Sequence, residues 1–166
     1  MRILSIDPGY ERLGIAILEK QNNKEVLVYS ECFKTSAKIP HSERLALIAT
    51  KIDSILDIYK PNALAIEMLL FNSNQKTALL VAEARGLIIG IVGKRNLKVF
   101  EYNPLQIKVA VTGFGRSDKS QVIFMVKKLI DVSSKVKNDD EFDAIACGLT
   151  FFATEKDFQK TFPQVT

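Results

Sequence analysis

Short blocks of alternating apolar and polar residues in the first third of the chain are typical of β-strands. Residues 1–7 (MRILSID) are mostly apolar or β-branched and run into a Pro-Gly turn, as a buried strand does. Two further strands are predicted at 14–20 (GIAILEK) and 25–33 (EVLVYSECF), with a turn at 21–24 (QNNK) between them. Three strands joined by short turns indicate an antiparallel meander.

Helical spacing replaces this pattern after residue 40. Ser42 is the expected cap of a helix that ends before Pro61. Its apolar side chains recur at helical intervals, at Leu45, Ile48, Ile52 and Ile55. The short and almost wholly apolar segment 63–69 (ALAIEML) then predicts a central parallel strand.

Helices and strands continue to alternate through the second half. The predicted elements are an apolar helix over 76–92, a strand over 97–103 and a short helix over 104–113. Asp118 and Gln121 resemble a capping box for the next helix, and the last helix is expected to begin near Asp139. The order β-β-β-α-β-α-β-α-α-α predicts an α/β fold, a mixed five-stranded sheet covered by helices.

Composition narrows the class of protein. The 166 residues, 47% of them hydrophobic, can bury a core within one domain, which we expect over 1–158 with a tail at 159–166. No stretch approaches the ~20 apolar residues of a membrane span, and the acidic Asp7 comes too early for a signal peptide. Cys32 and Cys147 belong to no zinc-binding pattern, so we expect a reduced, cytoplasmic protein in which both thiols are small apolar fillers.

Charge is distributed unevenly along the chain. Residues 1–84 are balanced, residues 85–137 carry a net charge of +8, and residues 138–166 carry −4. A basic middle segment beside an acidic one suggests a bound polyanion next to a carboxylate site, although a solvated lysine-rich surface would give the same totals.

Four carboxylates stand at the positions where such a site would form. Asp7 ends the first strand, Glu67 lies inside an apolar strand, and Asp140 and Asp143 share one face of the last helix. Each has a structural alternative: Asp7 in an Asx-turn, Glu67 in an ion pair with Arg85 or Lys108, and the helix acids favoured by the helix dipole.

These four acids together predict a metal site. Strand ends and a helix start can meet at one edge of a parallel-type sheet. Oxygen ligands without histidine or cysteine suit Mg²⁺, with Mn²⁺ as an alternative. Two such ions about 4 Å apart would support phosphodiester hydrolysis.

The same segments resemble the RuvC family of Holliday-junction resolvases, within the ribonuclease-H-like superfamily. The resemblance covers roughly residues 1–152 and rests on several motifs in order: DPG at 7–9 with Gly14, AIE at 65–67, Asn74, AEARG at 82–86, FEYNPLQIKVAVTG at 100–113, DKSQV at 118–122 and DDEFDAIA at 139–146. It implies the ribonuclease-H-like strand order, with three antiparallel strands followed by parallel ones. It also implies a homodimer that makes paired symmetric nicks in four-way junction DNA and works with a branch-migration motor.

The resemblance assigns roles residue by residue. The family's metal-binding acids correspond to Asp7, Glu67, Asp140 and Asp143, and its phosphate-contacting lysines to Lys108 and Lys119. Phe71 is the candidate for stacking on DNA, although the family phenylalanine aligns with Leu70 in one register and Phe71 could simply pack the sheet end. Further expected phosphate contacts are Lys76, Arg85, Arg116, Lys127 and Lys128.

The helix over 76–92 carries small residues every four positions, including Ala82, Gly86 and Gly90. The resemblance implies that this stripe contributes to the dimer interface, and internal helix–sheet packing is the alternative.

His41 is expected only to start a helix. Two other functions remain open, a ribonuclease-H-like RNA-processing nuclease and a non-catalytic junction-binding protein. An actin-like ATPase fits poorly because the chain is short and lacks a second glycine-rich phosphate loop.

Overall fold

A computed structural model describes residues 1–69, 75–132 and 136–162, with the side chains of residues 75 and 76 excluded. Its elements follow the predicted order and add one short helix at the end of the chain. They are β1 (Arg2–Asp7), β2 (Arg12–Gln21), β3 (Lys24–Lys34), α1 (His41–Tyr59), β4 (Ala63–Glu67), α2 (Gln75–Lys94), β5 (Lys98–Tyr102), α3 (Pro104–Thr112), α4 (Lys119–Leu129), α5 (Asp139–Thr154) and α6 (Lys156–Gln159).

The five strands form one mixed sheet in the order β3-β2-β1-β4-β5. The first three pair antiparallel, as the meander prediction requires, whereas β4 pairs parallel to β1 and β5 pairs parallel to β4. Asn22 and Asn23 both have positive φ angles, which suits the tight turn between β2 and β3. The predicted mixed sheet is therefore confirmed.

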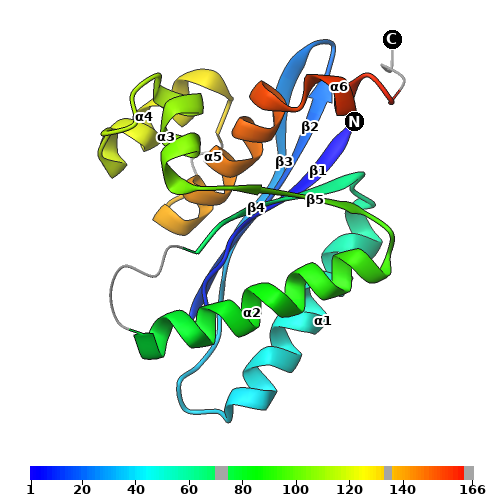
Figure 1. Cartoon of the computed structure of the whole chain (residues 1–166), viewed down its shortest axis with the longest axis vertical. Coiled ribbons are helices and arrows are strands. Elements are labelled where there is room, and N and C mark those ends of the chain that lie inside the picture. Colours follow the sequence, from blue (N-terminus) through cyan, green and yellow to red (C-terminus); the bar gives the residue numbers. More distant parts are fainter. Residues whose placement is uncertain (70–74, 133–135, 163–166) are drawn as a thin grey trace.

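Helices cover both faces of the sheet (Figure 1). Alternate residues of β1 point to opposite faces, so Leu4 and Ile6 pack toward α1 and α2 while Ile3 packs toward α3, α4 and α5. Two separate apolar cores result, one on each face.

Helix α5 lies very close to the sheet because its contact residues are small. A Cβ on Gly148 would come within 2.7 Å of a Leu18 methyl and 2.8 Å of the Ser5 hydroxyl. A Cβ on Gly14 of β2 would come within 2.1 Å of the backbone oxygen of Asp140. Gly14 therefore allows the first turn of α5 to lie against the end of β1 and the start of β2, and Gly148 allows the middle of the helix to lie against the same two strands.

The stripe of small residues on α2 faces away from the sheet. The buried face of α2 is made by Ala84, Ile88 and Val92. Gly86 and Gly90 are exposed, and a Cβ at either would meet nothing within 4 Å in the described part of the protein. Internal packing of these glycines, the alternative considered from the sequence, is therefore wrong.

One local prediction is also corrected. Ser42 does not cap α1, because the helix already begins at His41 and its N-cap is Pro40, which has an extended backbone. The C-terminal segment contains the helix α6, whose Phe158 packs against Phe100 and Phe151.

Among the described residues, no helix combines the length and apolar character needed to cross a membrane.

Candidate active site

Two predicted acids meet where neighbouring parallel strands end. Asp7 closes β1 and Glu67 closes β4, and the register that pairs Ile6 with Ile66 sets these two residues side by side. Alternate residues of each strand face α5, and Asp7 and Glu67 are among the residues on that face. The carboxylates therefore lie on one face, at one edge of the sheet.

Helix α5 adds a third acid to this edge. Asp143 lies one turn into α5 and lines the same pocket as Asp7 and Glu67, a cavity of about 270 Å³. The floor of the pocket includes Ile107 and Ala146. The Asx-turn proposed as the alternative for Asp7 is absent within the described ranges, because no hydrogen bond holds its carboxylate.

Two lysines also line the pocket. Lys108 comes from α3 and Lys119 from the first position of α4. Both helices begin with capping boxes, built by Asn103 and by Asp118, which determine where each helix starts. The Lys119 ammonium lies 2.9 Å from an Asp143 carboxylate oxygen.

Burial and repulsion between carboxylates raise the pKa of all three pocket acids, and for Asp143 the repelling charges are those of Asp140 and Asp139. Burial raises the pKa of Asp7 well above its ordinary value, and the charges of Glu67 and Asp143 raise it further. Burial and the charge of Asp143 raise the pKa of Glu67 to about 7, although the two lysines oppose this shift. Burial also raises the pKa of Asp143, against the effect of its hydrogen bond with Lys119.

This donor set fits a hard divalent cation. Its ligating atoms are carboxylate oxygens, and a bound cation would relieve the repulsion that raises the three pKa values. The acids are not gathered into a finished metal site, since residues 1–69, 75–132 and 136–162 contain no group of three or more acid, histidine or cysteine side chains arranged to hold an ion. A cation would have to draw the carboxylates closer together.

Asp140 does not line the pocket, although its spacing from Asp143 predicted that the two would converge. Its carboxylate turns toward β2 and β3, where Arg12 Nε donates to it at 2.8 Å and the Cys32 thiol lies at 3.4 Å. Partial burial would raise the pKa of Asp140, but the hydrogen bonds from Arg12 and Cys32 and the charge of Arg12 together lower it. Neither Arg12 nor the polar role of Cys32 was predicted, because both lie far from Asp140 in the sequence.

Several other predicted residues take different positions. Arg85 does not pair with the Glu67 carboxylate; its side chain donates to the Glu67 backbone oxygen at 3.0 Å and pairs with Glu101. Arg116 is exposed on the loop between α3 and α4. His41 does begin α1, and its ring contacts the Tyr10 hydroxyl at 2.7 Å. The predictions for Leu70, Phe71, Asn74 and the Lys76 side chain lie outside the described residues.

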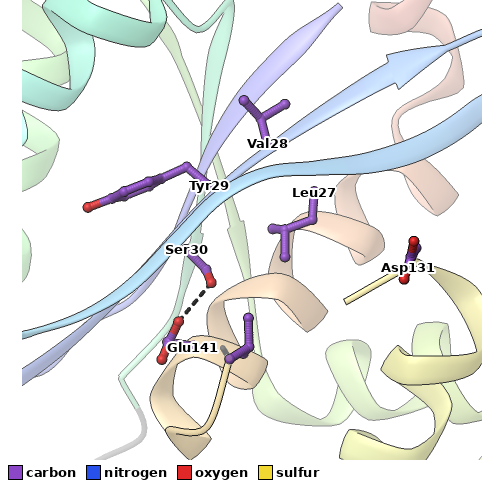
Figure 2. Close-up of a pocket in the computed structure, with 7 residues that line it drawn as sticks. Leu27, Val28, Tyr29, Ser30, Asp131 and Glu141 are labelled. Atoms are coloured by element: carbon purple, nitrogen blue, oxygen red, sulfur yellow. Dashed lines mark hydrogen bonds between the residues drawn. The ribbon is translucent and has the colours of Figure 1, made fainter. Parts of the chain in front are cut away.

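A second groove, of about 430 Å³, lies on the edge strand β3 and contains none of the predicted catalytic side chains. Figure 2 shows Leu27 and Ser30 of β3 on its wall, with Asp131 across from them. Ser30 donates to Glu141 at 2.7 Å, which ties the first turn of α5 to the sheet. This groove is larger than the acidic pocket but lacks its chemistry, so the acidic pocket is the candidate active site.

Comparisons with known proteins agree with this arrangement. The sequence model described as crossover junction endodeoxyribonuclease RuvC matches residues 3–151. Proteins with that name from Caldicellulosiruptor saccharolyticus and Halothermothrix orenii are 43% and 42% identical to this chain over 151 and 149 residues, and 90% of each chain is covered. Thermus thermophilus RuvC in complex with a Holliday junction substrate superposes with a TM-score of 0.88 at 28% identity, covering 95% of this chain and 96% of that one.

The uncomplexed Thermus thermophilus RuvC structure gives a TM-score of 0.86 at 27% identity, covering 95% of this chain and 97% of that one. The similarity extends over β1 to α5 and so includes the strand ends and the helix that carry the pocket acids. The predicted ribonuclease-H-like fold and the resemblance are both confirmed. The chain belongs to the RuvC family of crossover junction endodeoxyribonucleases.

Proposed function

We propose that this protein resolves four-way DNA junctions by paired symmetric nicks, through metal-assisted hydrolysis of phosphodiester bonds. The observation that carries the proposal is the composition of one pocket, in which Asp7, Glu67 and Asp143 face Lys108 and Lys119. The acids can hold cations and the lysines can hold a phosphate, so one pocket supplies both the metal ligands and the phosphate contacts that the reaction needs. Members of the same family are named for this activity.

The acids and Lys119 would have different roles in the hydrolysis. Asp7 and Glu67 would hold two Mg²⁺ ions, or Mn²⁺ in their place, Asp143 would complete the set of ligands, and Asp140 would join it only after leaving Arg12. Such ions lower the pKa of a bound water and stabilise charge on the phosphate. Burial alone would lower the pKa of Lys119, but its hydrogen bond to Asp143 raises it. The lysine therefore stays protonated at neutral pH and can stabilise negative charge as it develops on the phosphate.

A homodimer would place two such pockets on matching strands of a two-fold symmetric junction. Support comes from the exposed stripe on α2, where Gly86 and Gly90 leave room for another backbone to approach. Leu79, on the same helix, is 61% exposed and would add apolar area to such a contact. Association with a branch-migration motor is proposed from the family resemblance alone.

The test is cleavage of a synthetic four-way junction, with a linear duplex and an RNA–DNA hybrid as alternative substrates. Each is incubated with Mg²⁺ or with EDTA, using the wild-type protein and the Asp7→Asn variant. Asp131→Asn is the matched control, because it removes an exposed carboxylate that lies outside the acidic pocket.

We expect paired nicks only in the junction, only with Mg²⁺, and with the wild-type and Asp131→Asn proteins but not with Asp7→Asn. Asp7→Asn should keep the fold and still bind the junction. Cleavage of the hybrid instead would move the function to RNA processing. Tight junction binding without any cleavage would indicate a binding protein, and loss of binding together with cleavage in Asp7→Asn would contradict a purely catalytic role for Asp7.

A further inference from the structure

A groove lined by two exposed aromatic rings lies next to the active site. Phe114, in the loop between α3 and α4, is 59% exposed, and Phe124 of α4 is 58% exposed. Together with four polar residues and Met125 they line a groove of about 680 Å³; the polar residues are Thr112, Ser117, Ser120 and Gln121. The activity proposed above uses none of these side chains.

The loop that presents Phe114 is held firmly by hydrogen bonds. The Phe114 amide donates to the Thr112 hydroxyl at 3.1 Å, and its carbonyl accepts from the buried Ser117 hydroxyl at 2.8 Å. The next residue, Gly115, packs so closely on α3 that a Cβ there would lie 2.5 Å from a Leu105 methyl. A ring held on an ordered backbone loses little conformational entropy when it binds a partner, which favours a binding role.

Apolar exposure continues around the two rings. Single exposed apolar residues are common, but a contiguous group of them marks an interaction surface. Near the rings, Leu105 and Val109 of α3 are also exposed, and both lie close to Gly115, which follows Phe114. No part of the core within the described ranges requires these side chains to be apolar, so their hydrophobicity points to a partner.

The charge around the groove identifies the kind of partner. Arg116 is exposed beside Phe114, and the Lys128 ammonium stands 5.6 Å from the centre of the Phe124 ring. Residues 85–137 as a whole carry a net charge of +8. Aromatic rings among basic side chains are the combination that binds single-stranded nucleic acid, because bases stack on the rings while phosphates meet the cations.

The position of the groove favours DNA over a protein partner. Ser120 and Gln121 of the groove directly follow Lys119, which lines the active-site pocket, so the two sites share the first turn of α4. A helix with its side chains is about 10–12 Å across, and a DNA strand rises about 3.4 Å per nucleotide. A strand with one phosphate in the active site therefore reaches the groove after about three nucleotides.

We infer that Phe114, assisted by Phe124, stacks on an unpaired base of the junction strand about three nucleotides from the phosphate in the active site. The inference rests on the proposed function, since it assumes that a junction strand enters the acidic pocket. It adds a contact that would favour junctions over linear duplex, because paired bases in a duplex are already stacked and unavailable.

The test compares junction and duplex binding by Phe114→Ala, Phe114→Leu and Phe114→Trp. Leucine keeps apolar bulk without a ring face, whereas tryptophan keeps a larger face. Ile58→Ala is the matched control, because Ile58 is 66% exposed on α1, away from the groove. In parallel, 2-aminopurine is placed at successive positions on either side of the cleaved phosphate, and its fluorescence is followed as protein is added.

We expect Phe114→Ala and Phe114→Leu to weaken junction binding about 5- to 150-fold, the range for loss of one stacked base, with little effect on duplex binding. Phe114→Trp and Ile58→Ala should bind as the wild type does. One 2-aminopurine position near three nucleotides from the cut should change in fluorescence with the wild type and not with Phe114→Leu.

The inference would be overturned if Phe114→Leu and Phe114→Ala bound the junction as tightly as the wild type. It would also be overturned if no 2-aminopurine position responded to the wild-type protein. Either result would leave the surface to a protein partner. The same experiment separates this from a failure of the proposed function. A wild-type protein that neither binds nor cuts the junction refutes both. A wild-type protein that resolves junctions while its Phe114 variants match it refutes only the stacking contact.

Discussion

The half-buried acid Glu67 should destabilise the metal-free protein at neutral pH, and its neutral isostere should reveal by how much. Glu67 ends β4 on the inner face of the sheet, where its carboxylate shares a pocket with Asp7 and Asp143. Glu67→Gln keeps the shape of the side chain and removes its charge. We therefore expect this substitution to stabilise the fold while it disables a predicted metal ligand.

The magnitude follows from the pKa of Glu67, which burial and the charge of Asp143 raise from 4.5 to about 7. The folded protein holds this proton more tightly than the unfolded chain, so its stability falls as the pH rises through that interval and levels off above it. One pKa unit corresponds to about 1.36 kcal/mol, and the shift therefore to roughly 3 kcal/mol. Allowing for partial solvent screening, we expect Glu67→Gln to gain about 2 kcal/mol at pH 8 and almost nothing near pH 4.5.

Urea unfolding in EDTA at both pH values measures the effect as a difference in free energy of unfolding. Glu43→Gln, at an exposed position in the first turn of α1, is the control and should show no comparable pH-dependent gain. Adding Mg²⁺ at pH 8 should stabilise the wild type more than Glu67→Gln. Equal effects of Glu67→Gln at the two pH values, or a loss of stability at pH 8, would refute the reasoning.

Four further substitutions test other parts of the structure. Lys119→Ala should slow junction cleavage more than it weakens binding, measured by single-turnover kinetics and titration; equal losses would make it a simple phosphate anchor. Arg12→Ala should raise the pKa of Asp140, followed by NMR titration, and an unchanged pKa would exclude the ion pair in solution. Gly14→Ala should cost about 2 kcal/mol or more in urea unfolding, because its Cβ would meet a backbone oxygen. Gly86→Leu should leave the fold intact but shift sedimentation toward the monomer, and an unchanged dimer would move the interface elsewhere.

Elements with strong local signals are the ones that the sequence predicts correctly. The strand pattern, the Asn22–Asn23 turn and the capping box at Asp118 and Gln121 depend on residues close together in the chain. The end of β4 does not follow in this way: the sequence predicts a strand over 63–69 with Glu67 inside it, whereas β4 ends at Glu67, where the acid can leave the apolar core.

Weak local signals account for the errors. Ser42 has the right chemistry for a cap, but Pro40 ends the preceding extended segment and allows the helix to begin one residue before the serine. Helix α6 spans only Lys156–Gln159, too few residues for a periodic pattern. Phe158 reaches its partners Phe100 and Phe151 through the tertiary fold, and no spacing in the sequence indicates those contacts.

Asp140 shows the limit of spacing arguments most clearly. Three residues separate it from Asp143, so a helix allows both carboxylates to reach the same pocket. The register of β2 nevertheless brings Arg12 beside the start of α5, and its guanidinium donates to the same carboxylate that the pocket requires. The two positions compete, since turning the carboxylate into the pocket would separate its Oδ2 atom from Arg12. Spacing thus determines which positions the Asp140 carboxylate can reach. The charges around it determine which of these positions it occupies, and those charges come from residues more than a hundred positions away in the sequence.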